Sequence, residues 1–213
     1  MKCVKIVAAA GVLVAGCLSS QATTLLPGQA GLDSPQAPGT VVLDKLVTPY
    51  SFAGISGTIT SWVVRDPGNP LGGLSFYYQV SNTGTEGIGR ISTSDFGITP
   101  GVPVEVSTIT ATTPFDTSVL GGVLPTIASR SSGAGSVVGF NFLGIEVLPG
   151  QSSVVMVVNT SYTGFQVTSG SVIDSASVNV AILGPIPEPS TFMAGSLLLL
   201  PFCASALRIV RKR

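Results

Sequence analysis

Histidine is absent from this sequence of 213 residues. Without an imidazole the chain cannot build Ser-His-Asp or Cys-His catalysis, and it lacks the commonest ligand of zinc sites. It also lacks the side chain that ordinarily exchanges protons near neutral pH. We therefore predict that the protein is not an enzyme, has no catalytic residues and holds neither a metal nor another cofactor.

Cysteine is scarce, and the three cysteines lie near the two ends of the chain, at Cys3, Cys17 and Cys203. The long middle part can therefore form no disulfide within itself. A fold without disulfides must be stabilised by its own apolar core, and about 140 residues are enough to bury one.

Charged residues make up only 9% of the chain, and they are unevenly placed. Four cations lie outside the first five and last six residues, namely Lys45, Arg65, Arg90 and Arg130. All ten acids lie between Asp33 and Glu188, so the middle part has a net charge of about −6. A surface of this sign repels nucleic acid, which we exclude as a partner.

The first 22 residues have the pattern of a secretory signal peptide. Lys2 and Lys5 precede an apolar run over residues 6–18, and Ser20 and Ala22 are the small residues that signal peptidase reads. We predict cleavage after Ala22. The alternative is lipidation of Cys17, since residues 14–17 resemble a lipobox.

The last 30 residues, 184–213, combine a short motif, an apolar segment and a basic end. The motif is Pro187, Glu188 and Pro189, and a transmembrane helix is predicted over about residues 191–210. Its uncharged part covers about 24 Å of a roughly 30 Å hydrocarbon layer, so the helix must extend past Arg208, whose guanidinium bends toward the headgroups. A basic stop-transfer group holds the end in the cytoplasm; it consists of Arg208, Arg211, Lys212 and Arg213.

This order of features resembles the PEP-CTERM sorting tag of bacterial surface and secreted proteins. The resemblance implies an exosortase-type membrane transpeptidase as partner, which recognises the Pro-Glu-Pro region and removes the helix. It further implies a precursor held transiently in the membrane, and then a place on the cell surface or in the extracellular matrix of a Gram-negative-type bacterium. Association with extracellular polysaccharide or biofilm would follow. The alternative is a plain C-terminal anchor behind a Pro-rich linker.

Residues 41–183 alternate short apolar runs with turn residues, which predicts an all-β domain. We expect strands over residues 58–64, 74–80, 88–92, 102–109, 136–142, 152–158 and 171–182. Helical periodicity is absent, so the pattern favours an antiparallel β-sandwich with Greek-key connections, with a barrel as the alternative. Residues 154–158 are apolar throughout and predict a central strand. The Pro- and Gly-rich residues 23–40 are interpreted as a linker or arm without regular structure.

Two stretches, residues 78–84 and 148–152, resemble the strand-turn signatures of bacterial immunoglobulin-like surface modules. The resemblance implies an immunoglobulin-like fold more than any particular function.

Candidate ligand-binding residues are few. The carboxylates are scattered singly, and the aromatic residues that could stack on sugar rings are Trp62, Tyr77, Tyr78, Phe52 and Phe115. Tyr77 lies on the strand face opposite to Phe76 and Tyr78, so we expect part of its ring to face solvent. The favoured hypothesis is a non-enzymatic exported surface or matrix protein. The alternative is a carbohydrate-binding or glycan-hydrolysing sandwich acting on the same polysaccharide.

Overall fold

A computed structural model describes residues 22–32, 35–37, 39, 41–97, 101–109 and 122–186. All secondary-structure elements in these residues are β-strands. Within the described ranges, no helix is long and apolar enough to cross a membrane. The predicted tail helix and the apolar part of the predicted signal peptide lie outside these ranges.

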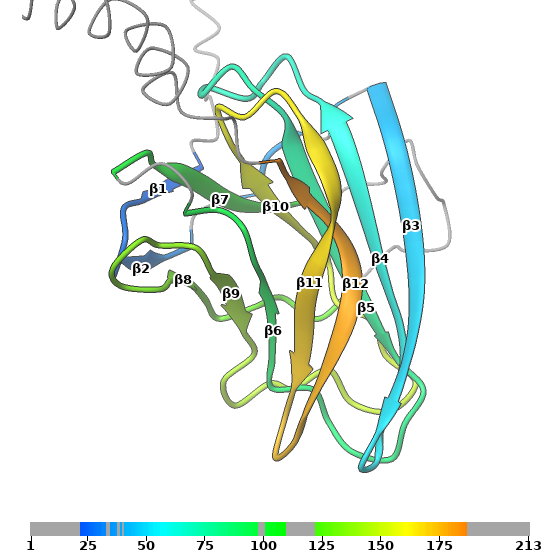
Figure 1. Cartoon of the computed structure of the whole chain (residues 1–213). Helices are drawn as coiled ribbons and strands as arrows, with labels where there is room; N and C mark the ends of the chain where they lie inside the picture. Colours follow the sequence, from blue (N-terminus) through cyan, green and yellow to red (C-terminus); the bar gives the residue numbers. More distant parts are fainter. Residues whose placement is uncertain are drawn as a thin grey trace, which may run out of the picture.

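In the described residues, twelve strands form two antiparallel sheets of six strands each (Figure 1). Sheet A has the order β1 (Thr23–Leu25), β7 (Val104–Ile109), β10 (Val155–Asn159), β5 (Ser75–Asn82), β4 (Ile55–Arg65) and β3 (Val41–Phe52). Sheet B has the order β12 (Ser177–Pro185), β11 (Phe165–Ile173), β6 (Arg90–Thr93), β9 (Val138–Asn141), β8 (Ile127–Arg130) and β2 (Ala30–Gly31). The described residues thus form the β-sandwich that the sequence predicts.

The two sheets face each other and meet along both edges. At one edge β12 of sheet B packs against β3 and β4 of sheet A, and at the other edge β1 packs against β2. The long hairpin β3–β4 forms one side of the molecule (Figure 1). Its turn holds Ala53 and Gly54 at positive φ, the backbone conformation that a tight antiparallel hairpin of right-handed twist requires.

The main core lies between the sheets and follows the alternation along the strands. In β5, Phe76, Tyr78 and Val80 point into this core and are fully buried. Phe76 meets Phe96 edge to face, with ring centroids 5.7 Å apart. The alternation in the sequence therefore identified the inward face of β5 correctly.

Several strand predictions are confirmed, and others need correction. Residues 154–158 fall in a central position, since β10 pairs with β5 on one side and β7 on the other. The predicted single strand over residues 171–182 is instead parts of β11 and β12, joined by a turn in which the Asp174 amide donates to the Ala176 carbonyl, 2.8 Å away. Residues 23–40 are not without regular structure, because β1 and β2 lie there. Strands β3 and β8 were not expected, and β12 continues to Pro185.

Tyr78 connects the two sheets, so replacing it should be costly. Its hydroxyl donates to the Leu183 carbonyl of β12 over 2.7 Å, and its ring is fully buried. We expect Tyr78→Ala to lower the free energy of unfolding by about 3 kcal/mol or more, because it leaves a cavity and an unpaired carbonyl. Tyr78→Phe keeps the ring and should cost only about 1 kcal/mol. Urea denaturation followed by circular dichroism measures both, and a loss below about 1 kcal/mol for Tyr78→Ala would contradict this packing.

Candidate functional site

The predicted processing sites border the sandwich. Ala22, the predicted cleavage residue, is half-buried and directly precedes β1. At the other end β12 stops at Pro185, and Ile186 is the last described residue. The alternative lipidation residue and the whole sorting tag lie outside the described residues, namely Cys17, Pro187, Glu188, Pro189, Arg208, Arg211, Lys212 and Arg213.

The expectation that Tyr77 faces solvent is wrong. Its side chain does point away from the main core, but it is 0% exposed. Burial accordingly raises the pKa of the Tyr77 phenol well above its usual range. Of the other sugar-stacking candidates, Trp62 and Tyr78 are buried, Phe115 lies outside the described residues, and Phe52 is 54% exposed at the β3–β4 turn.

Tyr77 is buried because the outer face of sheet A carries a second, smaller hydrophobic cluster. This cluster consists of Trp62, Val64, Tyr77, Ile109, Val155 and Val157. Lys45 on β3 adds a cation–π contact, with Nζ 5.6 Å from the centre of the Trp62 ring. Sheet A is therefore buried on both faces in this region, unlike the one-sided sheet that the sequence suggested.

A hydrogen-bonded group of polar side chains lies beside this second cluster, and Gln36 is its centre. We call Gln36, Asp66, Tyr77, Ser107 and Asn159 the Gln36 cluster. The Gln36 side-chain oxygen accepts from Ser107 Oγ at 2.5 Å and from Asn159 Nδ2 at 3.0 Å. Gln36 Nε2 and the Tyr77 hydroxyl both donate to Asp66 Oδ2, at 3.1 and 2.9 Å.

The Gln36 cluster joins residues 36 and 39 to sheet A. The backbone amide of Gln36 also donates to the Thr108 carbonyl of β7. The backbone amide of Gly39 donates to the Tyr77 hydroxyl. These contacts join segments far apart in the sequence, so no local sequence pattern predicts them.

Arg130 is a second buried polar centre. Its guanidinium donates to four backbone carbonyls, two from Nη1 and one each from Nε and Nη2; the acceptors are Leu25, Val102, Gly135 and Phe96, at 2.7–3.0 Å. The side chain is 3% exposed, and burial lowers its pKa. Arg130 therefore holds strand β1 and two loops together, and no ion pair with a carboxylate of the described residues accompanies these bonds.

The carboxylates do not assemble into a metal site. Within the part of the chain that the structure describes, no group of three or more potential metal ligands occurs. Burial raises the pKa of the Glu105 carboxyl, while a hydrogen bond from the Thr24 hydroxyl opposes that shift. Its other carboxylate oxygen, Oε2, is buried with no hydrogen-bond partner.

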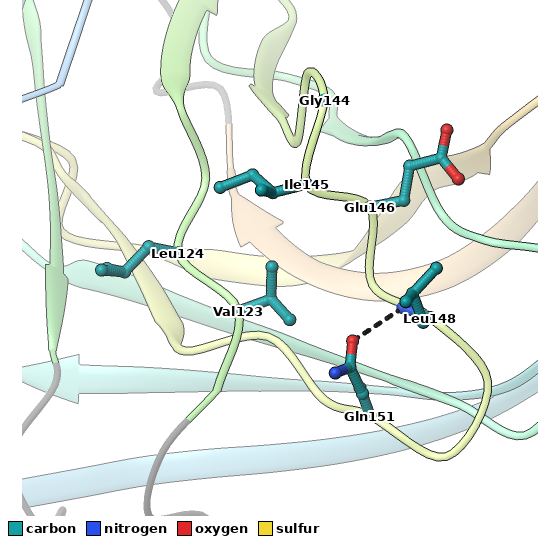
Figure 2. A pocket seen from close by; sticks show the side chains of 7 residues that line it. All are labelled: Val123, Leu124, Gly144, Ile145, Glu146, Leu148 and Gln151. Carbon is teal, nitrogen blue, oxygen red and sulfur yellow. Dashed lines mark hydrogen bonds between the residues drawn. The ribbon is translucent and has the colours of Figure 1, made fainter.

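An open pocket of about 600 Å³ lies between the loop that precedes β8 and the loop after β9 (Figure 2). It is lined by Val123, Leu124, Gly144, Ile145, Glu146, Leu148 and Gln151. The lining is mainly apolar, and the Glu146 carboxylate points away from it (Figure 2). The Gln151 side-chain oxygen accepts a hydrogen bond from the Leu148 backbone amide at 3.0 Å. Among the described lining residues Glu146 is the one carboxylate, whereas hydrolysis of a glycosidic bond uses a pair.

The described fold defines an all-β protein whose buried polar groups join segments of the chain. No family model, no curated protein and no solved structure matches this chain.

Proposed function

We propose that this chain is a non-enzymatic exported surface or matrix protein, delivered by a signal peptide and sorted by an exosortase-type transpeptidase. The observation that carries the proposal is the position of the folded part. Strand β1 begins directly after Ala22, and the Pro187–Glu188–Pro189 motif follows the end of β12 by one residue. Cleavage at either predicted site would therefore remove a segment without cutting a strand of the sandwich.

The finer assignment, an immunoglobulin-like module with Greek-key connections, is part of the same proposal. The two stretches that resemble such modules meet in space: the Asn82 amide donates to the Gln151 carbonyl, and the Gly150 amide donates to the Asn82 carbonyl. The Asn82 side chain also donates to the Val147 carbonyl, 2.7 Å away. This contact between a strand end and a distant turn supports the interpretation of the two stretches as parts of one module.

A non-enzymatic role is proposed over sugar binding or glycan hydrolysis. Those activities call for exposed aromatic rings beside facing carboxylates. Trp62 and Tyr77 are buried instead, and the pocket has one acid. The tag resemblance supports a setting in extracellular polysaccharide, with the sandwich as a structural component of that matrix.

Mass spectrometry of the protein recovered from the surface of its native host tests this proposal. We expect an N-terminus at Thr23, no lipid, and loss of the helix over residues 191–210. Cys17→Ala should leave this product unchanged, because Cys17 would already be removed with the signal peptide. A lipid-bearing Cys17 N-terminus would instead establish the lipidation alternative. A surface form that retains residues 191–213 would overturn the proposed sorting.

A further inference from the structure

Strand β3 begins with three consecutive apolar residues that are all exposed, and we call residues 41–43 the β3 start. Val41 is 48% exposed, and Val42 and Leu43 are each 38% exposed. The register with β4 shifts between Val42 and Asp44, so this end of β3 departs from regular alternation. In the described residues, neither hydrophobic cluster includes the β3 start. Adjacent exposed apolar side chains are typical of a surface that contacts a partner or a membrane.

The β3 start lies at the end of the sandwich where the chain leaves β12. The Leu183 amide donates to Ser61 Oγ at 3.0 Å, and Ser61 is paired with Leu46 of β3. The β3–β4 and β11–β12 turns both lie at the lower end of the molecule, so β3 and β12 run in opposite directions (Figure 1). Ile186 follows Leu183 by three residues, and the β3 start ends three residues before Leu46. Ile186 and the β3 start therefore lie at about the same level.

Only a short connection separates this end from the predicted transmembrane helix. Residues 187–190 lie between Ile186 and the helix predicted over about residues 191–210. The Cα steps from Ile186 to residue 191 span at most about 18 Å, and the headgroup layer takes up about 5–7 Å of that distance. Strand β3 has 12 residues and is about 40 Å long. The β3 start is thus the part of this strand nearest to the point where the chain enters the bilayer.

The charges on the sandwich favour the same orientation. Arg65 is exposed and is paired with Val41, which places a cation beside the β3 start. Asp44 and Lys45, the next residues of β3, are exposed and have opposite charges. The exposed acid Glu86 lies beside the β3–β4 turn, at the far end. A guanidinium next to apolar side chains suits the phosphate groups of lipids, whereas a carboxylate is repelled by them.

We propose that the β3 start is a lipid-contacting surface, which inserts its apolar side chains at the boundary between headgroups and acyl chains while the tail anchors the precursor. Arg65 contacts a lipid phosphate in this arrangement. The inference rests on the proposed membrane-held precursor. Because the short connection already keeps the surface at the bilayer, weak insertion is enough to orient the sandwich. Removal of the helix ends this attachment and lets the surface leave the lipid.

Fluorescent labels along β3 measure this contact in the full-length chain. Val42, Val47 and Phe52 are all exposed and follow one another at intervals of five residues, about 17 Å. Val42→Cys, Val47→Cys and Phe52→Cys are each labelled in a chain whose native cysteines are alanine, and reconstituted in phosphatidylcholine vesicles that carry a nitroxide on the acyl chains near the headgroups. We expect the label at position 42 to lose about half of its fluorescence or more, whereas the other two keep theirs.

A further variant shows whether the lipid is bound or only near. Val41→Ser combined with Leu43→Ser keeps the connection and the label at position 42, and should lower the quenching at least about twofold, because less apolar surface enters the lipid. Leu143→Ser is the matched control, since Leu143 is 68% exposed in the loop after β9. It should leave the quenching unchanged. Unchanged quenching in the double variant would mean that the short connection alone holds the β3 start at the bilayer, and the proposal would be wrong.

Flotation of the same vesicles separates failure of this surface from failure of the anchor. A chain that floats with the vesicles but shows no quenching at position 42 overturns the lipid-contacting surface and leaves the proposed anchor in place. A chain that does not float with the vesicles contradicts the anchor and, with it, this surface.

Discussion

Replacing Arg130 by methionine is expected to lower the free energy of unfolding by about 4 kcal/mol or more, since a hydrogen bond from a charged donor contributes about 1.5–3 kcal/mol. Methionine fills a similar volume but leaves four backbone carbonyls without the guanidinium as donor, the buried ones of Leu25, Phe96 and Gly135 and the partly buried one of Val102. The cost of burying the guanidinium offsets part of what these hydrogen bonds contribute. The same burial lowers the Arg130 pKa, because it disfavours the charged form. The loss should still exceed that of a typical core substitution.

Chemical denaturation of the purified protein, followed by circular dichroism, measures this loss. Arg65→Met is the matched control, because Arg65 is exposed at the end of β4 and should change stability by less than about 0.5 kcal/mol. Arg130→Lys should behave like Arg130→Met, since an ammonium cannot reproduce the fork of guanidinium donors. An Arg130→Met protein as stable as the Arg65→Met control would show that these hydrogen bonds contribute nothing net.

Glu188→Gln is expected to accumulate a larger, membrane-held precursor if the proposed sorting holds. Glu188 is the only charged residue between Gly184 and Leu207. In the proposed complex with the transpeptidase its carboxylate meets a charged or hydrogen-bonding group. Removing one partner of such a desolvated pair costs about 2 to 5 kcal/mol, which is more than about tenfold in processing. If the segment is a plain anchor, the carboxylate is solvated and the substitution should change nothing.

Immunoblots of membrane and released fractions from the native host separate these outcomes. Glu146→Gln is the matched control, because Glu146 is an exposed acid of the sandwich and should leave processing unchanged. Deleting residues 211–213 should instead disturb retention and orientation, since those cations act through the positive-inside effect. Equal mature mass and distribution for wild type and Glu188→Gln would overturn the sorting proposal.

The sequence by itself determined the class of fold and the inward face of its strands. Alternation in β5 placed Phe76 and Tyr78 in the core, and the uniform apolar run of β10 placed that strand in the middle of a sheet. These features are local, because successive side chains of a strand point to opposite faces and neighbouring residues therefore show which face is buried. Residues 171–182 were predicted as one strand although Asp174 and Ser175, two typical turn residues, indicate a turn within this segment.

Only the tertiary structure decided which outward-facing residues are covered. Tyr77 faces away from the core as alternation predicted, yet it is buried, because residues 36 and 39 reach it from a stretch that composition assigned to a linker. Arg130 follows buried Ala128 by two positions, which indicates an inward side chain, but three of its four acceptors lie far away in the sequence, at Leu25, Phe96 and Val102. Likewise, Gln36 meets Ser107 and Asn159 only after three separate segments come together. Such contacts depend on the arrangement of strands in the sheets, and short-range sequence patterns do not encode that arrangement.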